Sequence, residues 1–258
     1  MKVLIVGDVH GDLEGLARLV QRARRRHGVA AAIQLGDFGF EARILERFRR
    51  AKGRFAVPVH AIDGNHDDHL WLDRQARGGS VERWPDELNL HFRPRASAEA
   101  FGASVVGFLG GALHVDRPQK IHHGSRTSNF VQSRQRRSAA ELFNRVRPDL
   151  LVTHSCPAGI GIGLRGDEMF REGRAVHVTG AGFEAGPEME CGEPELSRLW
   201  EGLAFRPQAW VFGHFHSPHA AVIDGVQFVC PGASLEDKEG DPLLAWDTEA
   251  RRLEVLEP

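Results

Sequence analysis

Five short segments of the sequence carry side chains that bind metal ions or move protons. Each directly follows a run of apolar residues, and they are Asp8-Val9-His10, Gly36-Asp37, Gly64-Asn65-His66-Asp67, Thr153-His154 and Gly213-His214-Phe215-His216. Carboxylate, amide and imidazole ligands together suit borderline divalent cations such as Mn²⁺, Fe²⁺ or Zn²⁺. Seven residues are candidate ligands, too many for one tetrahedral ion: Asp8, His10, Asp37, Asn65, His154, His214 and His216. Two ions that share a carboxylate are therefore expected.

The spacing within two of these segments supports the metal hypothesis. Asp8 and His10 are two residues apart, as are His214 and His216, so the side chains of each pair share one face of an extended strand end. A single histidine is more often a hydrogen-bonded or surface residue than a ligand. That alternative becomes remote when metal-binding residue types recur after five successive apolar runs.

Strands and helices must alternate for these segments to meet. Apolar runs at 2–6, 31–35 and 57–62 are separated by helix-like stretches, the first of which has Asp12 at its N-cap position and the second of which covers 41–52. This order favours a parallel sheet, in which ligands bind beyond the carboxyl ends of the strands. A helix is expected to begin near Pro194. Further strands, the later ones paired as hairpins, are expected at 104–109, 150–153, 210–212, 222–223, 226–230, 243–246 and 253–256.

The ordered set of segments resembles the calcineurin-like metallophosphoesterase family. The family pattern is Asp-x-His, Gly-Asp, Gly-Asn-His-Asp/Glu, a His after a strand, and Gly-His-x-His. All five blocks occur here in that order, between residues 8 and 216. The resemblance implies an α/β fold, namely a four-layer αββα sandwich of two mixed β-sheets flanked by helices. It also implies a dinuclear metal centre at one rim of the sheets.

The resemblance also assigns roles to individual residues. His66 matches the catalytic histidine of the family, and Asp67 matches the acidic residue that orients it. Asp37 would bridge the two ions. The implied ligands are Asp8, His10, Asp37 and His216 for one ion, and Asp37, Asn65, His154 and His214 for the other.

The activity that the resemblance implies is hydrolysis of a phosphodiester or a phosphomonoester by metal-bound hydroxide. Two divalent ions, Mn²⁺ in the first place and Fe or Zn as alternatives, would clamp the phosphoryl group and lower the pKa of the attacking water. His66 would protonate the leaving group, or would stabilise charge without proton transfer. The protein serine/threonine phosphatase branch has an arginine beside the Asn-His block, whereas Asp68, His69 and Leu70 follow it here, which argues against that branch.

Composition limits the classes of partner. The chain has 258 residues, with 33 Lys and Arg against 35 Asp and Glu, so its formal net charge of −2 gives no global attraction to nucleic acid or to an anionic membrane. No segment approaches the roughly 20 apolar residues of a membrane span, and the first residues do not read as a signal peptide. We expect a cytoplasmic protein with a small phosphorylated substrate, such as a nucleotide. A nuclease acting on DNA or RNA and a non-catalytic scaffold are the alternatives.

Two stretches depart from the alternation of strands and helices within the single domain expected over residues 1–258. Residues 117–137 form a basic insert with no Asp or Glu, which either binds nucleotide phosphates or a nucleic-acid backbone or is a solvated loop. Residues 159–195 form a Gly-rich loop, for which we expect a mobile flap beside the metal rim. The basic residues singled out in the insert are Lys120, Arg126, Arg134, Arg136 and Arg137.

Two smaller features have both a structural and a functional interpretation. The segment Gly110-Gly111-Ala112, which continues to Asp116-Arg117, resembles a segment of some bacterial members of the family. Its backbone amides either approach a phosphate or form a tight turn, and the turn is favoured. Three cysteines lack the spacing of metal or disulfide sites and are expected to be reduced, buried thiols: Cys156, Cys191 and Cys230.

Overall fold

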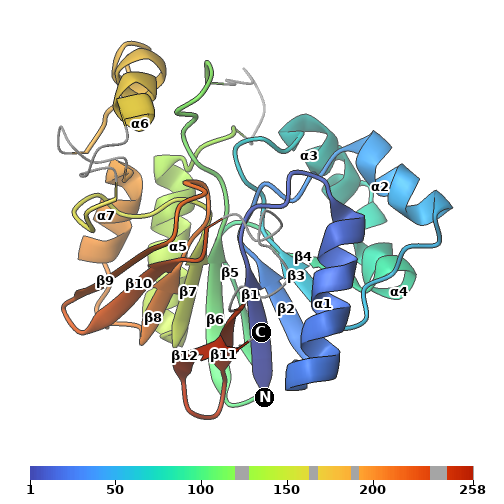
Figure 1. Cartoon of the computed structure of the whole chain (residues 1–258). Helices are drawn as coiled ribbons and strands as arrows, with labels where there is room; N and C mark the ends of the chain where they lie inside the picture. The colour runs from blue at the N-terminus through green and yellow to red at the C-terminus, as the bar shows by residue number, and fades with distance from the viewer. Residues whose placement is uncertain (120–127, 163–167, 187–191, 233–242, 258) are drawn as a thin grey trace.

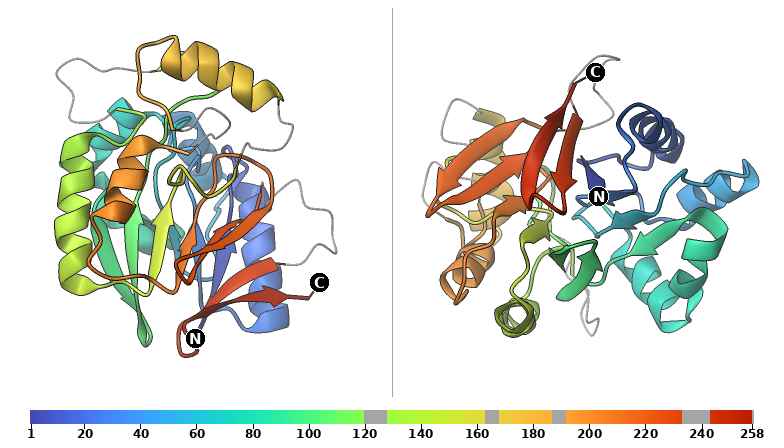
Figure 2. Two further views of the ribbon diagram at one scale, coloured as in Figure 1. Left: turned by 90° about the vertical axis from the view of Figure 1, so that its left-hand side faces the viewer. Right: turned by 90° about the horizontal axis from the view of Figure 1, so that it is seen from below.

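The computed structural model describes residues 1–119, 128–162, 168–186, 192–232 and 243–257. Two mixed β-sheets of six strands each pack face to face, and helices cover their outer faces (Figures 1 and 2). The four-layer sandwich predicted from the sequence is therefore confirmed.

The first sheet, called sheet A, has the strand order β12-β11-β1-β2-β3-β4. Strands β1 to β4 run parallel, and β11 and β12 extend one edge in antiparallel pairing. Its strands are β1 Lys2–Val6, β2 Ala31–Gln34, β3 Val59–Ala61, β4 Leu90–Phe92, β11 Leu243–Asp247 and β12 Arg252–Leu256. The helices on its outer side are α1 Leu13–His27, α2 Ala42–Arg50, α3 His69–Arg77 and α4 Trp84–Leu88, with a 3₁₀ turn at Ser80–Arg83.

The second sheet, called sheet B, has the strand order β5-β6-β7-β8-β10-β9. Strands β6, β7, β8 and β10 are parallel, while β5 and β9 pair antiparallel at the two edges. Its strands are β5 Ser97–Phe101, β6 Ser104–Leu109, β7 Leu150–Thr153, β8 Ala209–Val211, β9 His219–Ile223 and β10 Val226–Cys230. Helices α5 Ser133–Val146 and α7 Pro194–Glu201 cover it, and α6 Glu168–Gly173 with a π-helical turn Arg174–Thr179 lies beyond the strand ends (Figure 1).

Alternation along the strands explains the four layers. In β1, Val3 and Ile5 face sheet B in the core between the sheets, whereas Leu4 and Val6 face the helices on the other side. All four side chains are buried, with at most 3% of their surface exposed. Successive side chains of a strand point to opposite faces, so a strand that is apolar throughout must be covered on both.

Helix α1 shows how the chain turns back after a strand that ends at the site. The Asp12 carboxylate accepts a hydrogen bond from the Gly15 N–H at 2.8 Å, as the N-cap prediction required. The helix ends at Gly28, whose φ of 66° is the left-handed conformation that glycine adopts without strain. The start and the end of helix α1, which connects β1 to β2, are thus determined by the Asp12 cap and by Gly28.

Helix α5 begins inside the stretch expected to be a basic insert. Gln132 and Gln135 close its first turn as a reciprocal capping box, and Ala139 and Phe143 are buried against sheet B. The solvated-loop interpretation is therefore wrong from Ser133 onward, because these residues belong to a core-packed helix. Lys120 and Arg126 lie outside the described residues.

Two further expectations concern cysteines and membranes. Cys156 and Cys230 are buried, as expected, and Cys191 lies outside the described residues. Across the described ranges, each helix is too short or too polar to pass through a bilayer.

Truncation of Phe143 tests the assignment of α5 to the core. Phe143 is 1% exposed, so Phe143→Ala should lower the free energy of unfolding by about 3–5 kcal/mol through lost burial and a cavity. Arg137→Ala, on an exposed position of the same helix, should change it by no more than about 0.5 kcal/mol. Chemical denaturation of both variants measures the difference, and equal effects would contradict the core assignment of this helix.

Candidate metal centre

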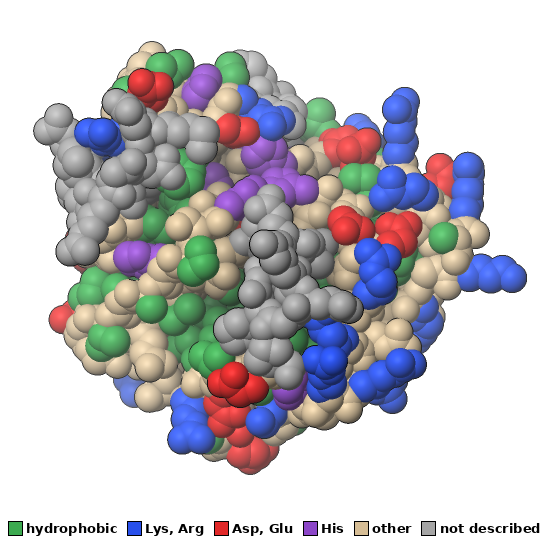
Figure 3. Space-filling model, in the orientation of Figure 1, with side chains coloured by type: hydrophobic (Ala, Val, Ile, Leu, Met, Phe, Trp, Pro, Cys, Tyr) green, Lys and Arg blue, Asp and Glu red, His purple; other side chains and the backbone are tan. Residues whose placement is uncertain are grey.

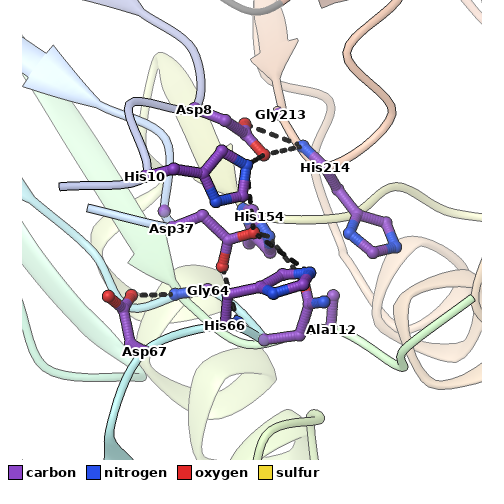
Figure 4. A network of polar contacts seen from close by, with 12 residues as sticks. Asp8, His10, Asp37, Gly64, His66, Asp67, Ala112, His154, Gly213 and His214 are labelled. Atoms are coloured by element: carbon purple, nitrogen blue, oxygen red, sulfur yellow. Dashed lines mark hydrogen bonds and ion pairs between the residues drawn. The ribbon is translucent and has the colours of Figure 1, made fainter. Parts of the chain in front are cut away.

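The predicted ligands lie at the carboxyl ends of strands from both sheets (Figure 4). Asp8, Asp37 and Asn65 follow β1, β2 and β3 of sheet A, while His154 and His214 follow β7 and β8 of sheet B. The His214 backbone N–H donates to both carboxylate oxygens of Asp8, at 3.0 and 3.2 Å, and so ties the two sheets together at this rim.

The backbone is left-handed at four of the predicted ligands. This conformation is uncommon for residues other than glycine, and it concentrates at functional sites where the surroundings enforce it. The residues and their φ angles are His10 at 44°, Asp37 at 51°, His214 at 73° and His216 at 50°. For His10, Asp37 and His216, this backbone accompanies side chains that lie within 4.8 Å of other donor atoms at the rim.

Two glycines make room for carboxylates that come from other segments. A Cβ atom on Gly213 would lie 2.3 Å from Oδ1 of Asp8, and one on Gly64 would lie 2.2 Å from Oδ1 of Asp37. A Cβ atom does not lie this close to a non-bonded atom in proteins, so any side chain at either position would displace a carboxylate. The glycines of the Gly-His and Gly-Asn segments are therefore part of the site.

One group of donor atoms forms around Asp8. His216 Nε2 lies 3.1 Å from Asp8 Oδ2 and 2.9 Å from His10 Nε2, and the imidazole of His10 also lies 4.0 Å from Oδ2 of Asp37. The side chains of His10 and His216 are each 41% exposed, whereas Asp8 and Asp37 are almost fully buried. Figure 3 shows several histidine side chains gathered in one patch near the middle of this face of the molecule.

A second group of donor atoms also includes Asp37 Oδ2. His154 Nε2 lies 2.8 Å from Asn65 Oδ1 and 3.4 Å from Asp37 Oδ2. The opposite nitrogen of His154, Nδ1, donates to the Leu35 carbonyl at 2.7 Å, which leaves Nε2 as the nitrogen that faces the donors. This group is buried, since Asn65 and His154 have no exposed surface.

The spacing of these donor atoms fits divalent cations. Bonds of about 2.1 Å place adjacent ligands about 3.0 Å apart in an octahedron, and a tetrahedron of the same bonds places them about 3.4 Å apart. The observed separations of 3.1 and 3.4 Å within the two groups fall in this range, and those of 2.8 and 2.9 Å lie just below it. Asp37 borders both groups, as a bridging carboxylate must.

His214 is placed differently from the other predicted ligands. Its ring packs against that of His154 at a centroid distance of 5.1 Å and, in Figure 4, is directed away from Asp8 and Asp37. Within the described part of the chain, its nitrogens join none of the sets of three donors that lie within 4.8 Å of one another. The backbone of His214 thus contributes to the site through Asp8, and the ligand role of its ring stays a prediction.

Burial and charge together set the protonation of the second group. Burial would raise the pKa of Asp37, but the adjacent His154, followed by His66 and His10, lowers it well below 3.8. Burial would lower the pKa of His154, but the carboxylates of Asp37 and Asp8 and its hydrogen bonds raise it to about 10. A proton on His154 therefore balances the buried carboxylate in the metal-free protein.

His66 lies at the mouth of the site. Its backbone N–H donates to Asp37 Oδ1 at 2.7 Å, and its side chain is 23% exposed. The ring nitrogen Nε2 lies 4.0 Å from Asp37 Oδ2 and 3.4 Å from Asp116 Oδ2. The imidazole is thus held between the metal ligands and solvent.

Asp67, expected to orient His66, makes different contacts. Its carboxylate accepts hydrogen bonds from the backbone N–H groups of Gly39, Phe40 and Gly64 at 2.7–2.8 Å, and Figure 4 shows the one from Gly64. Burial raises its pKa to about 6, against the effect of these hydrogen bonds. Asp67 therefore joins the loops after β2 and β3. Two other described carboxylates lie beside the His66 ring, Asp116 at 3.4 Å and Asp37 at 4.0 Å.

The segment after β6 brings two residues to the site that the sequence analysis did not assign. The N–H groups of Gly111 and Ala112 donate to the carbonyls of Asp63 and Asn129, in two distant segments, so both amides are used within the protein. The favoured tight turn is not found at residues 110–114, which are irregular. The same segment carries His114 and Asp116, which with His66 form a further cluster of donor atoms within 4.8 Å of one another. The signal for them was weak, since they stand four and six residues after the glycine pair begins rather than at a strand end.

A sequence profile of the calcineurin-like phosphoesterase family matches residues 1–218, a span that includes every residue of the two donor groups. The chain belongs to the calcineurin-like phosphoesterase family. The family uses divalent metals, in agreement with the donor set found here.

Individual relatives are distant. A lariat debranching enzyme of Arabidopsis thaliana is 22% identical over 289 residues, covering 99% of this chain and 66% of the relative, so the chain spans less than two thirds of it. The solved structure of TT1561 from Thermus thermophilus has a TM-score of 0.58 at 14% identity, covering 99% and 98% of the two chains. A putative 5'-nucleotidase from Staphylococcus aureus has a TM-score of 0.54 at 14% identity, covering 99% of this chain and 52% of its own. These structures show that the phosphoesterase fold is shared.

The part of the Gly-rich stretch that the structure describes lies near the metal rim. The rings of Phe170 and Phe215 meet edge to face at 5.8 Å, and the Gln119 side chain donates to the His177 carbonyl at 2.8 Å. Helix α6 is therefore placed beside the site, as the flap hypothesis requires, and its motion stays a prediction.

The raised pKa of His154 predicts proton release on metal binding. Because its folded-state pKa of about 10 is above the ordinary 6.5, the stabilising His154–Asp37 pair is complete below pH 6.5 and is lost as pH rises through 10. A cation must displace this proton, so its affinity should rise by up to about tenfold per pH unit between pH 7 and 9. Calorimetric Zn²⁺ titration in buffers of different ionisation enthalpy measures the release.

A matched control removes a histidine outside the site. His27→Gln, at the end of α1, should leave the number of released protons unchanged, whereas His154→Asn should reduce it by about one. Zinc binding by the unchanged chain without proton uptake into the buffer would contradict the charge balance described for the metal-free site.

Proposed function

We propose that the chain is a hydrolase that cleaves a phosphodiester or a phosphomonoester and depends on two divalent metal ions, with Mn²⁺ as the first choice. The observation that carries the proposal is the position of Asp37, whose carboxylate borders both donor groups. Membership of the calcineurin-like phosphoesterase family supports the reaction class.

The predicted ligands would bind the two metal ions in two sets that share Asp37. Asp8, His10 and His216 would hold one ion, Asn65 and His154 the other, with Asp37 between them and His214 added to the second. When bound, two such ions offset the charge of a phosphoryl group and lower the pKa of water that attacks phosphorus. The tight burial of the carboxylates fixes the ligands in advance, so little reorganisation is needed during the reaction.

His66 would act on the leaving group. It lies beside Asp37 at the open side of the site, and the Asp116 carboxylate 3.4 Å away favours a ring orientation with a proton on Nε2. A leaving alkoxide needs a proton, and an imidazolium can supply it. Burial lowers the pKa of His66, and the carboxylates of Asp37 and Asp116 act against this shift by favouring the protonated ring. In this proposal Asp116 takes the orienting role that the family resemblance assigned to Asp67.

The substrate would be small and phosphorylated, such as a nucleotide. Arg117, half exposed and bound to Asp116 at 3.0 Å, places a positive charge next to His66. Of the other basic residues expected to bind phosphates, Arg136 is engaged with Glu195 at 3.2 Å and thereby joins α5 to α7. A nucleic-acid phosphodiester is therefore the second candidate, and the intact donor set argues against a non-catalytic scaffold.

Chelation and substitution of Asp37 test the reaction class. The Mn²⁺-loaded protein should hydrolyse bis-p-nitrophenyl phosphate, p-nitrophenyl phosphate or both, should lose this activity with EDTA, and should regain it with Mn²⁺. Asp37→Asn should lower kcat/KM by at least about 100-fold, because the shared ligand loses its charge. Asp149→Asn, remote from the site, should have little effect.

Turnover of a panel of nucleotides and dinucleotides by the same preparation then separates the small-molecule substrate from the nucleic-acid candidate. Absence of hydrolysis of all these esters by protein shown to contain metal would contradict the hydrolase and favour the scaffold.

Substitution of His66 tests its role as a proton donor. His66→Gln should reduce kcat by about 10²- to 10⁴-fold on phenyl esters, whose leaving group is basic, and by much less on p-nitrophenyl esters. Steady-state kinetics on both ester series with His66→Gln and the surface control His27→Gln make the comparison. An equal loss on both series would instead indicate electrostatic stabilisation by the His66 ring.

A further inference from the structure

The side chain of His114 contacts Asn65 inside the protein. Asn65 Nδ2 lies 2.8 Å from His114 Nδ1, and both residues are fully buried. The contact joins the segment after β6 in sheet B to the segment after β3 in sheet A. The other described polar contact of the Asn65 amide is between Oδ1 and His154 Nε2, at 2.8 Å.

The two ends of the Asn65 amide are chemically opposite. The oxygen has lone pairs and can bind a cation, whereas the NH₂ group has only protons to offer. A half-turn about the last bond of the side chain would exchange the two and direct NH₂ at the donor group of Asp37 and His154. The fold must therefore distinguish the two orientations if Asn65 is to bind a metal ion.

We infer that His114 is a positioning residue that fixes the Asn65 amide with its oxygen toward the second metal ion. This inference rests on the proposed function, because it assigns Asn65 as a ligand. An unprotonated His114 Nδ1 accepts from the Asn65 NH₂ group, and a turned amide would place a carbonyl oxygen against that lone pair.

The surroundings of His114 agree with this hydrogen bond. Asp116 Oδ1 also lies near Nδ1, but at 3.3 Å it is 0.5 Å farther away than the Asn65 nitrogen. With Nδ1 as the acceptor, the proton of the neutral ring is on Nε2, which has no hydrogen-bond partner among the described residues. A buried histidine with one unpaired nitrogen is costly, and a need to orient Asn65 gives a reason for it.

A double-mutant cycle separates positioning from simple packing. In the unchanged background, His114→Ala should weaken Mn²⁺ binding at one of two sites by about 10- to 100-fold. With Asp at position 65, both side-chain oxygens can bind the ion and no amide has to be oriented. In the Asn65→Asp background, the same His114→Ala change should therefore alter the affinity by no more than about twofold.

A conservative variant guards against misfolding of the alanine variant. In His114→Asn, the amide oxygen occupies the place of Nδ1 and can accept from Asn65, so Mn²⁺ affinity should stay within about threefold of the unchanged chain. Calorimetry gives both Mn²⁺ affinities, and thermal unfolding of each metal-free variant shows whether it is folded.

The outcomes are distinct. An equal loss of Mn²⁺ affinity from His114→Ala in both backgrounds, or no loss in either, overturns the positioning role. The proposed function still stands in these cases if the protein binds two Mn²⁺ ions. A loss in His114→Asn as large as that in His114→Ala also overturns it. If the unchanged chain binds no Mn²⁺, the proposed function fails, and the inference fails with it.

Discussion

Two buried carboxylates at one rim of the sheets impose an electrostatic constraint on which the rest of the site depends. Asp8 and Asp37 are each 2% exposed, and both have an oxygen within 4.8 Å of the same histidine nitrogen of His154. Two negative charges that are this close together and this well shielded from solvent must be compensated by positive charge or hydrogen bonds, since an unpaired buried charge costs several kcal/mol. Backbone N–H groups of His66 and His214 and the proton on His154 supply part of the compensation. Divalent cations would supply the rest.

The fold is arranged to meet this constraint. Each sheet contributes parallel strands whose carboxyl ends reach the rim, so ligands far apart in sequence come together without long loops. The glycines before Asn65 and His214 leave space for carboxylates of other segments, and the backbone is left-handed at His10 and His216, whose imidazoles lie beside Asp8. The three buried layers of apolar side chains hold these strand ends in place.

Much of this arrangement could be predicted from the sequence, because it depends on local patterns. Apolar runs fixed β1, β6, β7 and β10 at their observed bounds, and residue types at strand ends identified the two donor groups. Helix α5 was missed since its first turns are rich in arginine and only two of its side chains, Ala139 and Phe143, are fully buried. The short strands β4 and β5 have little apolar periodicity to reveal them.

The details of the site were harder to predict because they depend on tertiary contacts. The sequence placed Asp67 next to His66 along the chain, but neighbouring residues point in different directions, and the Asp67 carboxylate is used by three backbone amides. His114 and Asp116 reach the site through the irregular segment after β6, whose backbone is hydrogen-bonded to Asp63 and Asn129. The orientation of the His214 ring likewise follows from its packing against His154.

The most direct test of the shared carboxylate is anomalous diffraction from crystals of the Mn²⁺-loaded protein. The account predicts two manganese peaks about 3.5–4 Å apart, each within bonding distance of Asp37, with Asp8 at one and Asn65 at the other. A single peak, or two peaks of which only one contacts Asp37, would contradict it.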